Sequence, residues 1–115
     1  MAGTTLMRAT LFGLLLQVIM VIAGHLSPAI AEFFPVGGML ISLVAGLVHG
    51  RAKPAWKTAV VGGAVAGGAC ALLGILVSWL LGDVPALILA MGTAMSALTG
   101  AIGGLVGWRL PRALA

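Results

Sequence analysis

The sequence predicts an all-α integral membrane protein with four transmembrane helices, and two observations carry this prediction. First, the 115 residues are 62% hydrophobic and only 7% charged, whereas soluble domains are about 45–50% apolar and about 25% charged. Second, the few charged residues separate four apolar stretches, each near the length of about 20 residues that a membrane span requires. So little charge cannot give a domain of this size a polar surface, which excludes a soluble globular fold, a disordered chain and a nucleic-acid-binding domain.

The charged residues and the turns set the boundaries of a single four-helix membrane domain over residues 1–115. The predicted helices are approximately residues 8–24, 27–49, 58–81 and 85–108. Ser27 before Pro28 is typical of an N-cap followed by proline in the first helical position. Asp83 is predicted to cap the fourth helix in the same way, ahead of Pro85. The four helices therefore form two hairpins.

One proline lies inside the second apolar stretch. Pro35 predicts either a kink or a break between a short helix Pro28–Phe34 and the main span. Neighbouring helices can satisfy the carbonyl that such a break leaves free.

The distribution of charge predicts the orientation. Four spans place every basic residue on one side of the membrane, and Glu32, Asp83 and His25 on the other. By the positive-inside rule the basic side is cytoplasmic, so both termini are expected inside the plasma (inner) membrane, N-in and C-in. Three tryptophans near helix ends are interpreted as interfacial anchors. The basic residues are Arg8, Arg51, Lys53, Lys57, Arg109 and Arg112, and the tryptophans are Trp56, Trp79 and Trp108.

Small residues recur at every fourth position in three of the predicted helices. Residues four apart share one helical face, and small residues there let helices approach closely in lipid, as in a glycine zipper. Two such faces are enough to hold one protomer together. The third face therefore suggests contact with a second copy or with other membrane subunits. The helix-packing residues are Gly38, Ser42, Gly46 and Gly50; Gly63 and Gly67; and Gly92, Ser96, Gly100 and Gly104.

The first and last of these patterns have the same order at an offset of 54 residues. A duplication of one hairpin would produce this match, and because both hairpins start and end on the basic side the repeat would be parallel, about an axis along the membrane normal. Chance is the alternative, because small residues are common in membrane helices. Both interpretations stay open.

No residue constellation points to catalysis, so the sequence predicts a protein that is not an enzyme and holds no metal and no cofactor. Cys70 lies in the middle of an apolar helix, where a reactive thiolate is disfavoured, and is interpreted as a packing residue. His25 and His49 fall at opposite ends of the spans, which excludes a haem held by both.

Three polar side chains are the transport candidates: Gln17, Glu32 and His25. Gln17 near the middle of the first helix is expected to hydrogen-bond between helices, or to line a pore or cavity. Glu32 is either solvated in the outer headgroup layer, alone or paired with His25, or it exchanges a proton for a cation during transport. Hydroxyl groups in the spans are expected mostly to bond to carbonyls of their own helix. These belong to Ser42, Ser78, Thr93, Ser96 and Thr99.

The first stretch has a second interpretation. Arg8, the apolar run Leu11–Ala23 and the small residues of Ala29–Ala31 together resemble a secretory signal peptide with its cleavage site. We treat the stretch as a genuine first helix.

Two function classes suit this sequence. The first is an oligomeric transporter or channel for a small solute or ion, in which the path forms between copies. The second is a non-catalytic accessory or assembly subunit of a larger membrane complex, and a weaker third is a holin-like permeabilising protein. The expected partners are the lipid bilayer and a second copy or other membrane subunits, with no nucleic acid.

Overall fold

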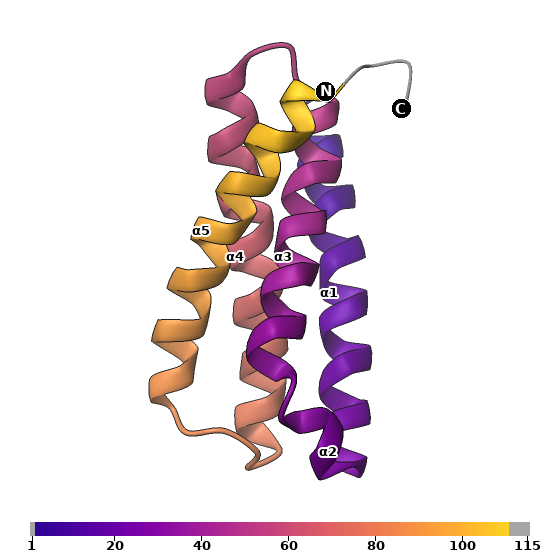
Figure 1. Cartoon of the computed structure of the whole chain (residues 1–115), viewed down its shortest axis with the longest axis vertical. Helices are drawn as coiled ribbons and strands as arrows, with labels where there is room; N and C mark the ends of the chain where they lie inside the picture. The colour runs from indigo at the N-terminus through magenta and orange to yellow at the C-terminus, as the bar shows by residue number, and fades with distance from the viewer. Residues whose placement is uncertain (1, 111–115) are drawn as a thin grey trace.

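The computed structural model describes residues 2–110, with the side chains of residues 5–30 and 32–110, and throughout these residues it has helices and turns but no strand (Figure 1). The all-α prediction is therefore confirmed. The elements in chain order are α1 (Ala2–Leu26), α2 (Pro28–Ala31), α3 (Phe34–Arg51), α4 (Trp56–Leu80) and α5 (Leu87–Arg109). Arg112 lies outside the described residues.

Four of these helices are long and apolar enough to cross a membrane, namely α1, α3, α4 and α5. This matches the predicted number of apolar helices. Their bounds differ from the predicted ones by a few residues at most ends, as is usual for frayed termini. The largest difference is in α1, which begins at Ala2 rather than at Arg8.

The break near Pro35 is confirmed, but it lies earlier than predicted. The short helix α2 ends at Ala31 rather than at Phe34, and α3 starts with Pro35 in its first turn. A proline costs little there, because the first N–H groups of a helix have no partner within the helix. Ser27 is at the N-cap of α2 with an extended backbone, although its side chain makes no cap hydrogen bond.

The predicted cap at Asp83 is wrong. Helix α5 begins at Leu87 after Ala86 and has no side-chain cap. Gly82 adopts a left-handed conformation (φ 80°) that turns the chain after α4. The carboxylate of Asp83 lies beside His25 of α1 instead, where the two side chains are 2.9 Å apart.

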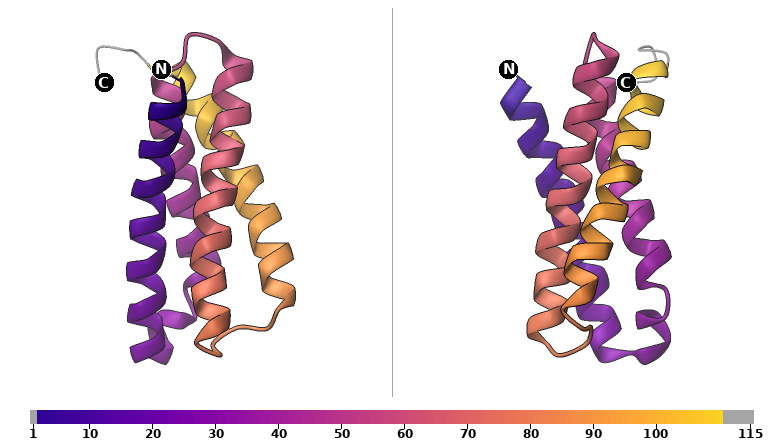
Figure 2. Two further views of the ribbon diagram at one scale, coloured as in Figure 1. Left: turned by 180° about the vertical axis from the view of Figure 1, so that it is seen from behind. Right: turned by 90° about the vertical axis from the view of Figure 1, so that its left-hand side faces the viewer.

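The four long helices run alternately up and down in one bundle (Figures 1 and 2). Helix α4 packs against α1, α3 and α5, and α5 packs most extensively against α4 and α3. The N-terminal part of α1 leans away from α4, as the right-hand view of Figure 2 shows. Helices α1 and α5 thus lie on opposite sides of the bundle.

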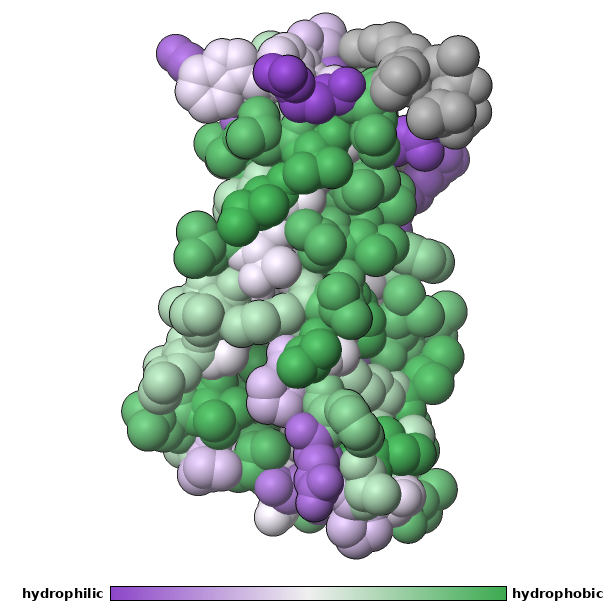
Figure 3. All heavy atoms as spheres, in the orientation of Figure 1, coloured by the Kyte–Doolittle hydropathy of each residue, from purple (hydrophilic) through white to green (hydrophobic). Residues whose placement is uncertain are grey.

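Charged residues gather at the two ends of the bundle, and apolar side chains cover the region between them (Figure 3). One end, here called the basic end, holds the start of α1, the loop between α3 and α4, and the end of α5. The opposite end, here called the acidic end, holds α2 with Glu32 and the α4–α5 loop with Asp83. The side chains of Arg8, Arg51, Lys53, Lys57 and Arg109 belong to the basic half.

Glycines bring α3, α4 and α5 together towards the basic end. A Cβ atom added at Gly46 would collide with the carbonyl of Gly100, and one added at Gly50 would collide with that of Gly104. In α4, a Cβ at Gly63 would lie 3.0 Å from the Cα of Gly104. Backbones that approach so closely leave no room for any side chain, so only glycine fits.

These small-residue faces pack on one another within the chain. A Cβ at Gly67 of α4 would meet both the Cα of Gly100, at 2.8 Å, and the Cβ of Ser42, at 3.2 Å. The face of α4 is therefore used inside the protomer, and the argument that it is left over for a second copy is wrong. The oligomeric state itself stays a prediction.

The element bounds agree in part with a repeat. Helices α1 and α4 both have 25 residues, and α4 starts 54 residues after α1 (56 − 2). Their packing is not equivalent, however, because α4 packs closely against both α3 and α5, whereas α1 packs against α3 and α4 and lies apart from α5. The duplication stays a prediction.

Candidate functional site

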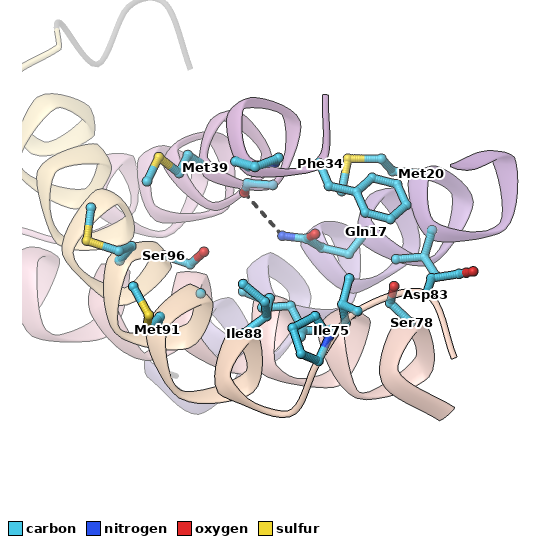
Figure 4. A pocket seen from close by; sticks show the side chains of 18 residues that line it. Gln17, Met20, Phe34, Met39, Ile75, Ser78, Asp83, Ile88, Met91 and Ser96 are labelled. Carbon is cyan, nitrogen blue, oxygen red and sulfur yellow. Dashed lines mark hydrogen bonds between the residues drawn. The ribbon is translucent and has the colours of Figure 1, made fainter. Parts of the chain in front are cut away.

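A cavity of about 440 Å³ lies between α1, α3, α4 and α5 in the acidic half of the bundle (Figure 4). Most of its lining is apolar, and the polar groups come from four side chains. The apolar side chains include Met20, Phe34, Met39, Ile75, Ile88, Met91 and Met95, and the polar ones are Gln17, Ser78, Asp83 and Ser96.

The cavity forms because the close glycine packing ends halfway along the bundle. At Gly38 and Gly92, the first members of the two patterns, the nearest atoms are no longer the backbone of a neighbouring helix. Gly38 faces the side chains of Gln17 and Met20, and Gly92 faces those of Ile75 and Ile88. Larger side chains hold the helices apart here, so α5 diverges from α3 towards the acidic end (Figure 1).

Gln17 closes the inner end of the cavity and is 2% exposed. Its Nε2 donates to the carbonyl of Gly38 (3.2 Å) and to Oγ of Ser42 (3.5 Å), and Ser42 donates in turn to the carbonyl of Gly67 (3.1 Å). Cys70 is fully buried beside them and donates to the same carbonyl. Gln17 thus joins α1 to α3 and α4, which confirms the predicted bond between helices.

The amide oxygen of Gln17 has no hydrogen-bond partner among the described residues, whereas its nitrogen has three. We assign the orientation of the amide from these bonds, since the nitrogen is the atom that can donate to a carbonyl. The oxygen is therefore the atom of Gln17 that can accept a hydrogen bond from a bound molecule.

The hydroxyl groups mostly do not bond to their own helices, so that prediction is wrong. Thr99 does, through Met95 (2.7 Å), but Ser42 bonds across to α4. The buried hydroxyls of Ser78 and Thr93 have no partner within the described part of the chain. Ser42 reaches the carbonyl of Gly67 because α3 and α4 pack closely at this level.

A contact between a histidine and an aspartate lies at the outer end of the cavity. Nδ1 of His25 and Oδ2 of Asp83 are 2.9 Å apart, and their side chains are 43% and 25% exposed. Asp83 lines the cavity, so the pair joins α1 to the α4–α5 loop at its mouth. His25 therefore pairs with Asp83 and not with Glu32, contrary to one of the predicted alternatives.

Among the transport candidates, the structure brings Gln17 to the cavity and His25 to its mouth. Glu32 is exposed in the turn between α2 and α3 and is not part of the lining. Sequence reasoning missed the methionines, although the signal was present. Four of the six methionines in the chain line the cavity, and such flexible side chains are typical of adaptable apolar sites.

The chemistry available at this site is binding of a mainly apolar molecule. Among the described residues no group of three His, Cys, Asp or Glu side chains could hold a metal ion. No protein-family model, curated protein or solved structure matches the chain. Fold and site together define a bundle of four long apolar helices with an apolar cavity in its acidic half.

Proposed function

We propose that the chain is an integral protein of the plasma (inner) membrane that transports a small, mainly apolar molecule. Four helices of sufficient length and hydropathy support membrane insertion. The large side chains on the outside of the bundle are mostly apolar, which suits contact with lipid rather than water. The basic end is proposed to be cytoplasmic under the positive-inside rule, with both termini inside.

The cavity is the observation that carries the transport proposal. Its volume of about 440 Å³ falls in the range of small-molecule sites. The apolar lining disfavours an ion, because transfer of a charge into such a site is costly without a partner. The free oxygen of Gln17 favours a molecule with one hydrogen-bond donor, such as a hydroxyl or an amine.

The shape of the cavity supports entry from the acidic end, beside the pair of His25 and Asp83. Towards the basic end, contacts such as Gly46 on Gly100 fill the space between the helices. The cavity therefore does not continue between α3, α4 and α5 into the basic half. For this reason we propose a homo-oligomer, in which the second half of the path runs between copies.

A matched pair of probes tests this function. The purified protein in detergent should bind 1-naphthol about tenfold more tightly than naphthalene, because only naphthol donates a hydrogen bond to Gln17. The protein in liposomes should also accelerate uptake of 1-naphthol above that of empty liposomes.

Other outcomes identify the alternatives. If the protein binds no probe and a different membrane protein co-purifies with it in a constant ratio, the accessory-subunit function is favoured. Release of a large entrapped dye from the liposomes would favour a holin-like protein.

A further inference from the structure

A second cavity lies at the basic end, between α1 and α4, away from the cavity of the candidate site. Its volume is about 460 Å³, and we call it the basic-end groove. Leu6 of α1 lines one side, and Val61 and Val65 of α4 line the other. The two valines are one helical turn apart, so they form a continuous apolar strip along α4. The lean of α1 in Figure 2 widens the space between these helices.

One end of the groove is suited to an anion. Lys57 and Thr58 line it from the first turn of α4, and no side chain caps this helix. The first N–H groups of a helix have no partner within the helix and carry the positive end of its dipole, which favours a negatively charged group such as phosphate. Lys57 and Thr58 also carry side-chain donors, and the ammonium group of Lys57 lies over the ring of Trp56, 5.8 Å from its centroid.

A buried histidine is the independent observation that points to a ligand. His49 of α3 also lines the groove and is 2% exposed; the backbone of Thr58 faces its ring, but neither ring nitrogen makes a hydrogen bond of good geometry. Its ring packs against Gly62, where any side chain would collide with it. Buried polar groups without partners are rare in folded proteins. An anion in the groove would supply an acceptor oxygen to the ring nitrogen of His49 that the backbone of Thr58 does not satisfy.

The charges around the groove match an anionic partner, since both acidic residues of the chain, Glu32 and Asp83, belong to the opposite end. A free phosphate would fill only the polar part and leave the valine strip uncovered. A phospholipid fills both parts, with its phosphate at the start of α4 and one acyl chain along the strip. We therefore propose that the basic-end groove binds one anionic phospholipid. This inference rests on the proposed insertion of the chain in a membrane, with the basic end in the leaflet that carries anionic lipids.

Lipid retention on the purified protein tests the proposal. Native mass spectrometry in detergent would compare phosphatidylglycerol, phosphatidylcholine with the same acyl chains, and inorganic phosphate alone. We expect one phosphatidylglycerol to be retained in preference to phosphatidylcholine, and phosphate alone not to be retained. The exposed Lys57 can be changed without disturbing the core, and Lys57→Gln should weaken binding about fivefold.

Arg109→Gln is the matched control, because Arg109 is exposed at the same end but does not line the groove. It should retain phosphatidylglycerol as the unmodified protein does. Equal retention of the two lipids, or equal losses in Lys57→Gln and Arg109→Gln, would overturn the proposal. Retention of phosphate alone would also overturn it, in favour of a soluble anion.

This experiment is independent of the transport proposal. It needs neither a solute in the first cavity nor any flux, so a failure to bind 1-naphthol leaves the lipid result unaffected. A chain recovered without detergent would instead refute membrane insertion, and the lipid proposal with it.

Discussion

Gly46 and Gly100 pack backbone against backbone: a Cβ atom on Gly46 would lie 3.0 Å from the Cα of Gly100 and would collide with its carbonyl. One turn further on, Gly50 and Gly104 make the same contact. Both pairs join α3 to α5 at positions 54 residues apart in the sequence. Dispersion contacts of this kind, rather than the hydrophobic effect, hold helices together in lipid.

The first prediction is that alanine at position 46 destabilises the bundle, although alanine is the better helix former. In Gly46→Ala the new methyl group has no space, so α3 and α5 must separate, at a cost of about 1–3 kcal/mol. Gly38→Ala is the matched control on the same helix, because its Cβ would have only ordinary contacts, the nearest at 3.6 Å to Oε1 of Gln17. That variant should be neutral or more stable by up to about 1 kcal/mol.

Unfolding in detergent micelles would measure both variants. Equal stability of Gly46→Ala and Gly38→Ala would contradict the close packing. Leucine at position 46 or at position 100 should have a larger effect in the same direction, since its side chain cannot leave the contact.

The second prediction concerns the hydrogen bonds of Gln17 and Ser42. Gln17→Met keeps a long unbranched side chain but removes the side-chain donor to the carbonyl of Gly38, so the bundle should lose about 1 kcal/mol of stability. Ser42→Ala removes the donor to Gly67 and should cost a similar amount. Because the two side chains bond to each other, the double variant should lose less than the sum of the single losses.

Thr99→Val is the control for this pair. The hydroxyl of Thr99 bonds only to the carbonyl of Met95 in its own helix, so its loss should change stability little. Additive losses for Gln17→Met and Ser42→Ala would show that the two residues act separately.

The third prediction tests the cavity by filling it. Met91 lines the cavity and is 54% exposed, so Met91→Trp can place an indole there while the bundle still folds. Binding of 1-naphthol should fall at least about tenfold, because the probe and the indole compete for one space. Met7→Trp is the control, since Met7 is similarly exposed on α1 but lies outside the cavity. Unchanged binding in Met91→Trp would place the probe elsewhere.

Part of this fold could be predicted from the sequence because it follows from local patterns. Apolar length alone indicates four helices, and the four-residue spacing around Gly46 and Gly100 indicates faces where backbones can meet. Which faces meet depends on all four helices at once. Gly67 shows this, because it packs between Ser42 and Gly100, whereas its spacing alone is equally suited to contact with a second copy.

The candidate site was predictable only in part for the same reason. Gln17 could be recognised from the sequence, because it is a single strongly polar residue near the middle of an apolar helix. The partner of His25 depends on the turn that Gly82 makes after α4, which brings Asp83 rather than Glu32 to it. The cavity arises where the close backbone packing ends, from the level of Gly92 towards the acidic end. No local sequence pattern marks the place where two helices diverge.

The fourth prediction concerns orientation in the membrane. Reporters active only in the cytoplasm, fused after residue 115 and after Gly82, should be active in the first case and inactive in the second. The reason is that the basic residues within the described part of the chain belong to one end, whereas Asp83 follows Gly82 at the other. The reverse pattern of activity would overturn the proposed topology and would place the mouth of the cavity in the cytoplasm.

The fifth prediction separates solute transport from coupling to a proton or cation. Glu32 is exposed outside the cavity, whereas Asp83 lines it and pairs with His25 at 2.9 Å. Glu32→Gln should therefore leave uptake of 1-naphthol by liposomes unchanged at acid and at neutral pH. Asp83→Asn, which weakens the pair at the mouth, should change the rate of uptake but cost at most about 1 kcal/mol of stability, as is usual for exposed pairs. Loss of pH-dependent flux in Glu32→Gln alone would instead make Glu32 the coupling residue, and the cavity would then lie beside the transport path.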